Sequence, residues 1–222
     1  MSLSVPDILL RPDAFFTTIV NEKESLKIPA LIVLIGGIVA AAYGYLVGQL
    51  SAKMMAGLMP GMDTIIVISA VGGALVGTFI FWLIVAGVFH ILSALFHGEG
   101  SFSRTLEVTG YGYLPQIFGA VITLIVAFEY LPKVTVPVLT KAALEDPAMI
   151  EAATKAFMHD PAMMEMTQIT ALVAIVFMLW SAHIWIFGMK HGRKLAMRDA
   201  AICVGLPIVL YVIYMIYNIG AM

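Results

Sequence analysis

The sequence predicts an all-α polytopic membrane protein, a bundle of five transmembrane helices with short interfacial helices. The mean hydropathy is +1.00, and 61% of the 222 residues are hydrophobic. Charged residues make up only 12% of the chain, about half their usual share in a soluble domain. They lie at the ends of five apolar segments and in the connections, and each segment is long enough to cross a bilayer core of ~30 Å.

Residues 1–27 form a charged, amphipathic lead-in. They are not predicted to be a signal peptide, because charges of both signs precede an apolar segment that begins too late and runs too long. Proline at positions 6 and 12, each followed by aspartate, is typical of a helix start. The lead-in is therefore expected to form one or two short turns at the headgroup boundary, with an apolar face made of Ile8, Leu9, Leu10, Phe15 and Phe16.

The membrane domain, residues 28–222, contains the five predicted spans. They cover residues 28–50, 64–96, 111–131, 168–189 and 200–219. As a helix the second apolar segment would be ~50 Å long, so we expect it to project from the membrane or to tilt. Small residues recur every fourth position on the first two spans and favour close helix packing; they are Gly36, Ala40, Gly44 and Gly48, and then Ser69, Gly73 and Gly77.

The stretch from Gly98 to Leu131 predicts an amphipathic helix that begins outside the lipid and then enters it. Ser103 is placed to cap the helix start. Pro115 has no N–H to donate, so it is expected to bend the helix and to free the carbonyl of Tyr111.

The outer loop, residues 132–167, is the only long polar connection. It contains a near-repeat, in which Asp146-Pro147-Ala148-Met149 returns fourteen residues later as Asp160-Pro161-Ala162-Met163. Aspartate before proline predicts an N-cap followed by the first helical residue. We therefore expect two short surface helices, whose methionines serve apolar packing in preference to a soft-metal site.

The distribution of Lys and Arg predicts the orientation in the membrane. With five spans the termini lie on opposite sides. A cytoplasmic N-terminus places eight basic residues inside and four outside, which predicts an N-in, C-out protein of the cell membrane. The inner set is Arg11, Lys23, Lys27, Arg104, Lys190, Arg193, Lys194 and Arg198, and the outer set is Lys53, Lys133, Lys141 and Lys155.

Three segments together resemble the Yip family of five-span membrane proteins. They are Asp7-Ile8-Leu9-Leu10-Arg11-Pro12-Asp13-Ala14-Phe15-Phe16, the connection Gly98–Phe102, and Tyr111-Gly112-Tyr113-Leu114-Pro115. The resemblance implies a membrane interaction protein, whose eukaryotic relatives are linked to Rab GTPases and vesicle trafficking. The short N-terminal segment and the large acidic outer loop differ from eukaryotic members, so the resemblance implies a prokaryotic-type member without an assumed Rab role.

Composition and motifs exclude several other classes. The net charge of −2 gives no basic footprint for nucleic acid. The chain lacks the HExxH and GxSxG motifs and paired cysteines, so we expect no enzyme activity and no cofactor. Its single cysteine, Cys203, cannot form an internal disulfide.

Ionisable residues within spans are costly and are often functional, so they define a second hypothesis, a small oligomeric ion or metal channel or transporter. A metal or proton site near the cytoplasmic side would use His90, His97, His183 and His191, the first two lying seven residues apart on one helix face. Glu129 would belong to an ion pathway. The simpler alternatives are a glutamate that reaches the interface and histidines bonded to neighbouring polar groups.

The first hypothesis remains an interaction or scaffold protein that binds the lipid bilayer and other membrane proteins, with a homo-oligomer formed through one of the glycine stripes as a further option. Its predicted cytoplasmic contact face consists of Arg104, Glu107, Lys190, Arg193, Lys194 and Arg198. The same basic residues could instead serve membrane topology and anionic headgroups.

Overall fold

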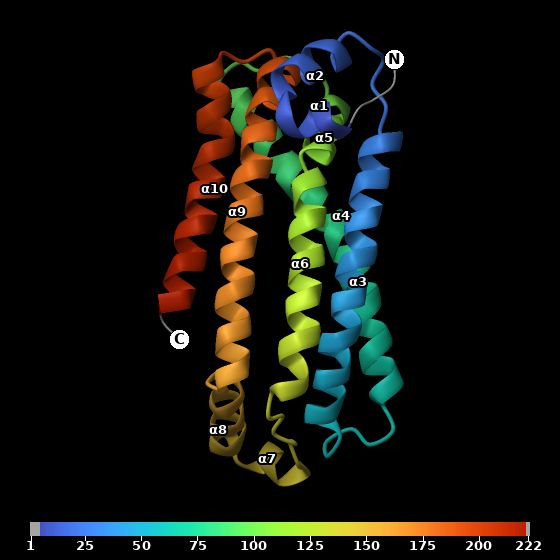
Figure 1. The fold of residues 1–222 in the computed structure, drawn as a ribbon, viewed down its shortest axis with the longest axis vertical. Helices are drawn as coiled ribbons and strands as arrows, with labels where there is room; N and C mark the ends of the chain where they lie inside the picture. The colour runs from blue at the N-terminus through green and yellow to red at the C-terminus, as the bar shows by residue number, and fades with distance from the viewer. Residues whose placement is uncertain (1–4, 221–222) are drawn as a thin grey trace.

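Five long helices stand side by side in the structure, and shorter helices lie across both ends of the bundle (Figure 1). The structure is a computed structural model that describes residues 5–220, including every side chain except those at positions 142 and 144. Its elements are α1 Val5–Leu10, α2 Pro12–Ile19, α3 Lys27–Met55, α4 Asp63–Leu95, α5 Phe102–Tyr111, α6 Leu114–Tyr130, the 3-10 turn η1 Leu131–Lys133, α7 Lys141–Glu145, α8 Pro147–Met158, α9 Pro161–Gly192 and α10 Met197–Gly220. The predicted all-α class is confirmed, since the described residues contain no strand.

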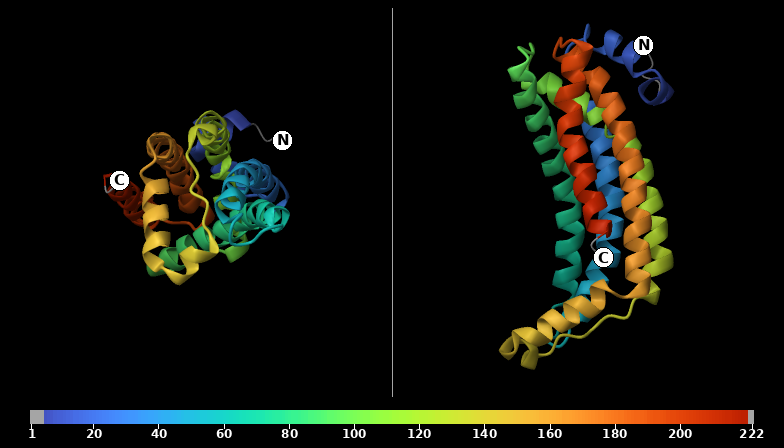
Figure 2. Two further views of the ribbon diagram at one scale, coloured as in Figure 1. Left: turned by 90° about the horizontal axis from the view of Figure 1, so that it is seen from below. Right: turned by 90° about the vertical axis from the view of Figure 1, so that its left-hand side faces the viewer.

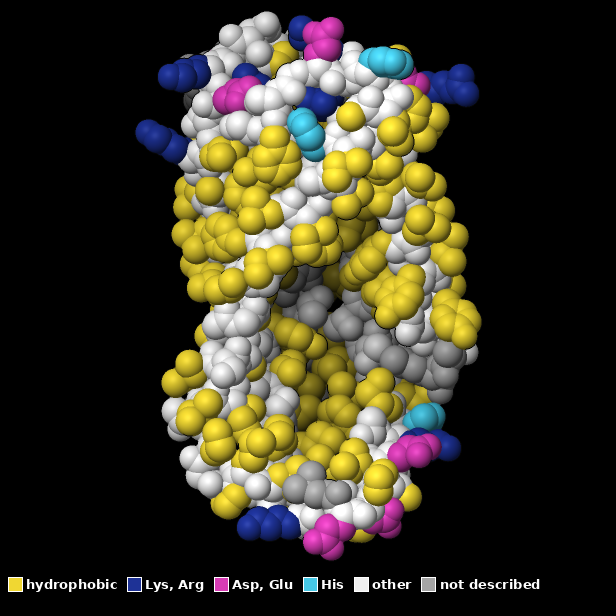
Figure 3. All heavy atoms as spheres, turned by 180° about the vertical axis from the view of Figure 1, so that it is seen from behind, with side chains coloured by type: hydrophobic (Ala, Val, Ile, Leu, Met, Phe, Trp, Pro, Cys, Tyr) yellow, Lys and Arg dark blue, Asp and Glu magenta, His cyan; other side chains and the backbone are white. Residues whose placement is uncertain are grey.

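The outer surface of the bundle matches a bilayer. Five helices, α3, α4, α6 with η1, α9 and α10, are long and apolar enough to cross a membrane. Charged side chains gather at the two ends, and apolar side chains cover the band between them (Figure 3). The chain is therefore a multi-pass membrane protein in which every spanning backbone segment is helical, as lipid requires.

Helices α3 and α4 form the longest contact in the bundle. A Cβ added at Gly44 would lie 2.8 Å from the carbonyl oxygen of Ala70, and one at Gly48 would lie 3.0 Å from Cα of Val67. Part of the small-residue stripe of α3 thus lets α4 of the same chain approach closely. At Gly73 of α4, by contrast, an added Cβ would have nothing within 4 Å.

The segment before α6 differs from the predicted bent helix. Helix α5 ends at Tyr111 and a new helix begins at Leu114, so Pro115 lies in a first helical turn, where its missing N–H breaks no helical hydrogen bond. The predicted cap was also wrong, because Ser101 is the N-cap and its hydroxyl accepts a hydrogen bond from the backbone N–H of Arg104 at 2.9 Å. These changes allow α5 to lie across the end of the bundle instead of continuing into it.

Both predicted Asp-Pro helix starts are present. Asp146 caps α8 and Asp160 caps α9 through their side chains. The second start does not give a short surface helix, however, since it opens the 32-residue helix α9, whose later turns cross the membrane. The connection between the two spans is therefore shorter than the expected loop 132–167, and among the described residues α7 and α8 lie across that end (Figures 1 and 2).

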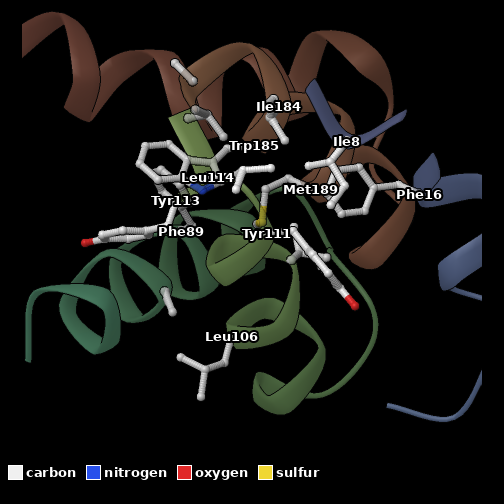
Figure 4. Packing of buried hydrophobic residues seen from close by; sticks show 14 of the residues in the cluster. Ile8, Phe16, Phe89, Leu106, Tyr111, Tyr113, Leu114, Ile184, Trp185 and Met189 are labelled. Carbon is white, nitrogen blue, oxygen red and sulfur yellow. The ribbon is translucent and has the colours of Figure 1, made fainter. Parts of the chain in front are cut away.

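The main hydrophobic core lies toward the end of the bundle that carries the lead-in. Phe16, Phe89, Ile184, Trp185 and Met189 are all at most 1% exposed and belong to one cluster. Figure 4 shows Trp185, Tyr113 and Phe89 meeting on one side of this cluster, with Ile8, Phe16 and Met189 on the other. The short helices α1, α2 and α5 are thus packed into the core from one end.

Helix α10 starts at the lead-in end and runs toward the other end between α4 and α9 (Figure 2, right). It packs along α9 and contacts α4 much less. Most of its outward residues are exposed and apolar, including Leu206, Val209, Leu210 and Ile213. This uneven packing leaves α4 supported mainly by α3.

Candidate functional site

A buried arginine closes the lead-in end of the bundle. Arg193, directly after α9, is 3% exposed. Its guanidinium donates hydrogen bonds to the hydroxyl of Ser93 at 2.9 Å, to the carbonyl of Gly98 at 2.8 Å and to the carbonyl of Gly100. Arg193 therefore ties two interhelical loops together, and it is not part of an exposed contact face as predicted.

A buried ion pair, Arg104–Glu107, holds the lead-in against α5. Arg104 and Glu107 lie 2.5 Å apart and are 8% and 2% exposed. Arg104 also donates to the carbonyls of Ile19 and Glu22, while the N–H of Ser25 donates to Glu107. Burial raises the pKa of Glu107 above its usual value, against the opposing effects of the Ser25 hydrogen bond and the Arg104 charge. This pair too was wrongly predicted to face outward.

The remaining members of the predicted contact face lie nearer the surface. Lys190 donates to Asp13 at 2.7 Å, and His191 lies 2.6 Å from the same carboxylate; these hydrogen bonds hold the pKa of Asp13 below its usual value. Lys194 is exposed and pairs with Glu99 at 2.8 Å, and Arg198 is exposed. The six residues thus do not form one charged patch: Arg104, Glu107 and Arg193 are buried and bond within the chain, and the other three are scattered nearer the surface.

The four candidate histidines do not form a metal site. Among the described residues, no group of three or more His, Cys, Asp or Glu side chains could hold a metal ion. His90 bonds to the hydroxyl of Thr105 at 2.9 Å, and His183 is exposed. His97 lies beyond the end of α4 with φ of 57°, so the expected common helix face with His90 is wrong.

Glu129, the predicted ion-pathway residue, lies at the far end of α6. Its carboxylate is 2.5 Å from the ammonium of Lys133, and both side chains are largely exposed. It is not among the residues that line the cavity within the bundle. The simpler reading, a glutamate at the interface, agrees with this position.

Hydrogen bonds from tryptophan indoles connect the short helices α1 and α5 to the membrane-spanning helices. These bonds were not predicted from the sequence. Trp82 donates to the carbonyl of Leu106 at 3.1 Å and Trp185 to the carbonyl of Thr109 at 2.8 Å, both in α5. Trp180 donates to the carbonyl of Leu9 in α1 at 3.2 Å. A buried indole N–H needs a hydrogen-bond acceptor. The tryptophans in the sequence could therefore have predicted such bonds, but the sequence does not reveal which carbonyl accepts each of them.

A cavity of about 520 Å³ opens within the apolar band of the bundle. On the face opposite that of Figure 1, the molecule is hollowed about halfway along, between apolar side chains (Figure 3). Its volume is typical of a site for a small organic molecule. Its walls come from α3, α4, α6 and α9 and include Gly36, Tyr43, Gly77, Thr78, Phe81, Tyr113, Gln116, Thr123, Met178 and Trp185.

A smaller cavity of about 160 Å³ adjoins the first and reaches α10. Phe81, Met178 and Trp185 line both cavities. We call the two together the cleft. It separates α4 from α9, two helices that α10 bridges only loosely.

One polar group in the cleft is left without a partner. Tyr113 is 6% exposed, lines the larger cavity, and its hydroxyl is the buried side-chain polar atom that has no hydrogen-bond partner among the described residues. Its ring lies edge-on to Phe81 and Trp185, at centroid distances of 6.4 and 6.0 Å. Tyr43 and Thr123 add further hydroxyls to the same walls, so the cleft combines mainly apolar walls with several hydroxyl groups, of which that of Tyr113 is buried without a partner.

Comparison with known proteins identifies the family. The family model of the Yip1 domain matches residues 7–218. An uncharacterized protein from Methanocaldococcus jannaschii is 38% identical over 126 residues, which cover 57% of this chain and 89% of the relative. No solved structure matches the chain. The archaeal relative supports a prokaryotic-type member, and the chain belongs to the Yip1 domain family.

Proposed function

We propose that this protein is a membrane interaction protein without enzymatic activity, and that it binds other membrane components in the cleft. The observation that carries the proposal is an open, mainly apolar cavity of about 520 Å³ between α4 and α9 that contains a hydroxyl without a partner. Cores of folded proteins are normally close-packed and their buried polar groups are bonded. A cavity that departs from both rules is the place where a partner would complete the structure.

The polar residues elsewhere support this role over transport. Arg104, Glu107 and Arg193, which could have formed a charged path, bond to groups of the chain itself. The cleft is lined by Tyr, Thr and Gln as its polar residues and by no charged side chain. A site of this kind suits an apolar or amphipathic molecule better than an ion.

The proposal includes the orientation deduced from the basic residues. The lead-in, α5 and the loop after α9 share one end of the bundle (Figure 1), and we assign this end to the cytoplasm of a cell membrane. Labelling with an impermeant thiol reagent tests this assignment. Lys133→Cys should react from outside the cell and Lys194→Cys only after permeabilisation; the reverse pattern would overturn it.

Site-specific photo-crosslinking in native membranes tests binding in the cleft. A photoreactive phenylalanine analogue replaces Phe81, which lines both cavities, or Phe118, which is exposed to the same extent, 45%, but lines neither. The proposal predicts a discrete set of adducts at position 81 that position 118 does not give. Identical adducts at both positions would contradict the proposal.

A further inference from the structure

Building on the proposed binding role of the cleft, we propose that its occupant is a glycerolipid of the cytoplasmic leaflet. One hydrocarbon chain of this lipid lies in the cleft, and its ester or ether oxygen accepts a hydrogen bond from the hydroxyl of Tyr113. Ester-linked and ether-linked lipids share the chemistry that the cleft would recognise, an apolar chain with a hydrogen-bond acceptor oxygen at one end.

The hydroxyl of Tyr113 calls for an acceptor that the protein does not supply. Two other polar side chains of the cavity are bonded internally: Thr78 donates to the carbonyl of Ala74 at 2.9 Å, and the amide of Gln116 donates to the hydroxyl of Ser181 at 3.0 Å. Among the buried side-chain nitrogen and oxygen atoms that the structure describes, only the hydroxyl oxygen of Tyr113 has no hydrogen-bond partner. A buried donor of this kind is costly unless an acceptor meets it, and lipid ester and ether oxygens are acceptors without competing donors.

The depth of Tyr113 matches that of a glycerolipid oxygen. The segment Leu114–Lys133 has 20 residues, a length of ~30 Å that equals one hydrocarbon core. The exposed Glu129–Lys133 ion pair marks one boundary of that core, so Tyr113, just before the segment, lies at the other boundary. Along α6 the cavity extends from Tyr113 to Thr123, which is ~15 Å or one leaflet.

The volume of the cavity favours a lipid chain over a partner helix. A membrane-spanning helix ~10 Å wide and ~30 Å long occupies on the order of 2,400 Å³. The larger cavity provides about 520 Å³. It can hold a single flexible chain within its walls, whereas a helix could only touch its rim.

A photoreactive lipid provides the test. Purified full-length protein is placed in proteoliposomes that contain phosphatidylcholine with a diazirine midway along one acyl chain, and adducts are mapped by mass spectrometry. We expect adducts on the cleft residues Phe81, Ile117 and Met178 in excess over Phe118. Uniform adducts along the apolar surface would overturn the lipid proposal.

Two glycines on one helix supply a matched pair of variants. A Cβ at Gly77 or at Gly73 would have nothing within 4 Å, so the first carbon of a larger side chain meets no clash at either position, but only Gly77 lines the cavity. Gly77→Leu should lower cleft adducts about tenfold, a change of ~1.4 kcal/mol, and Gly73→Leu should leave them unchanged. Thermal unfolding of both variants checks the fold, and equal adduct yields for the two would contradict the proposal.

Tyr113→Phe tests the polar contact. Losing one hydrogen bond should reduce cleft adducts about fivefold without moving their positions, and an unchanged yield would remove Tyr113 from the site. The crosslinks at Phe81 in native membranes distinguish a failure of the lipid assignment from a failure of the proposed binding role of the cleft. Protein adducts there without lipid adducts in proteoliposomes would overturn the lipid assignment alone, whereas no specific adducts in either system would overturn the binding role of the cleft as well.

Discussion

At the scale of single residues, the buried charged groups at the lead-in end of the bundle mainly bond to other parts of the same chain. A guanidinium presents several donors in a fixed plane, and Arg193 uses this geometry to bond Ser93, Gly98 and Gly100 at once. Lysine has the same charge without the planar fork. The contribution of Arg193 to the stability of the fold should therefore depend on the planar shape of its guanidinium as well as on its charge.

Replacing Arg193 by lysine should lower the free energy of unfolding by about 2–3 kcal/mol, because two of the three hydrogen bonds are lost at a buried position. Arg198→Lys, at an exposed position, is the matched control and should change it by less than about 0.5 kcal/mol. Thermal or denaturant unfolding in detergent measures both. Equal effects would show that Arg193 contributes only its charge.

Glycines in the spans should respond to substitution according to what faces them. A Cβ at Gly188 of α9 would run into the side chain of Val108, while one at Gly205 of α10 would have nothing within 4 Å. Gly188→Ala should therefore destabilise the fold by about 1–3 kcal/mol. Gly205→Ala should be neutral or stabilising by up to ~1 kcal/mol because alanine favours the helix. Destabilisation of equal size in both variants would contradict this packing.

Acid should release α2 from the end of α9. The hydrogen bonds from Lys190 and His191 hold the pKa of Asp13 below its usual 3.8. The contact therefore contributes its full stability above about pH 3.8 and loses it as the pH falls through the lowered pKa. Hydrogen exchange of α2 amides, corrected for the intrinsic rate, should rise in this window, and Asp13→Asn should exchange faster already at neutral pH. Identical pH profiles for the two proteins would exclude this role of Asp13.

At the scale of elements, helix starts were predictable because their signals are local. Aspartate before proline gave the starts of α8 and α9 correctly. The break between α5 and α6 was not predicted, since it depends on tertiary contacts: a Cβ at Gly112 would run into the indole of Trp185, from a helix far along the chain. Periodicity alone does not reveal such a contact.

The two N-caps, Asp146 and Asp160, should contribute differently to the free energy of unfolding, although their sequences are nearly the same. Asp160 accepts from the N–H groups of Ala162, Met163 and Thr135, whereas Asp146 accepts from Ala148. Asp160→Ala should cost about 1–2 kcal/mol of stability. Asp146→Ala should cost less than half as much, because α8 contains no buried residue. Unfolding measurements on the two variants test this order, and the reverse order would contradict it.

At the scale of the whole molecule, composition was enough to predict the all-α class with five candidate spans. The candidate site was not predictable. The cleft lies between α4 and α9, which are distant in sequence, and three of the six charged residues proposed as a contact face, Arg104, Glu107 and Arg193, are buried. A charged residue near the end of a span can set the membrane topology, take part in packing or bind a partner. Which of these applies depends on how α1, α2 and α5 pack around it, and the sequence does not show this packing.

The most direct test of this account is an electron cryo-microscopy map of the protein in lipid nanodiscs, with a bound antibody fragment to add mass. We expect α4 and α9 to be separated along the cleft, with elongated non-protein density that ends at the hydroxyl of Tyr113. A map in which α4 packs directly against α9, with that hydroxyl bonded to another side chain, would contradict it.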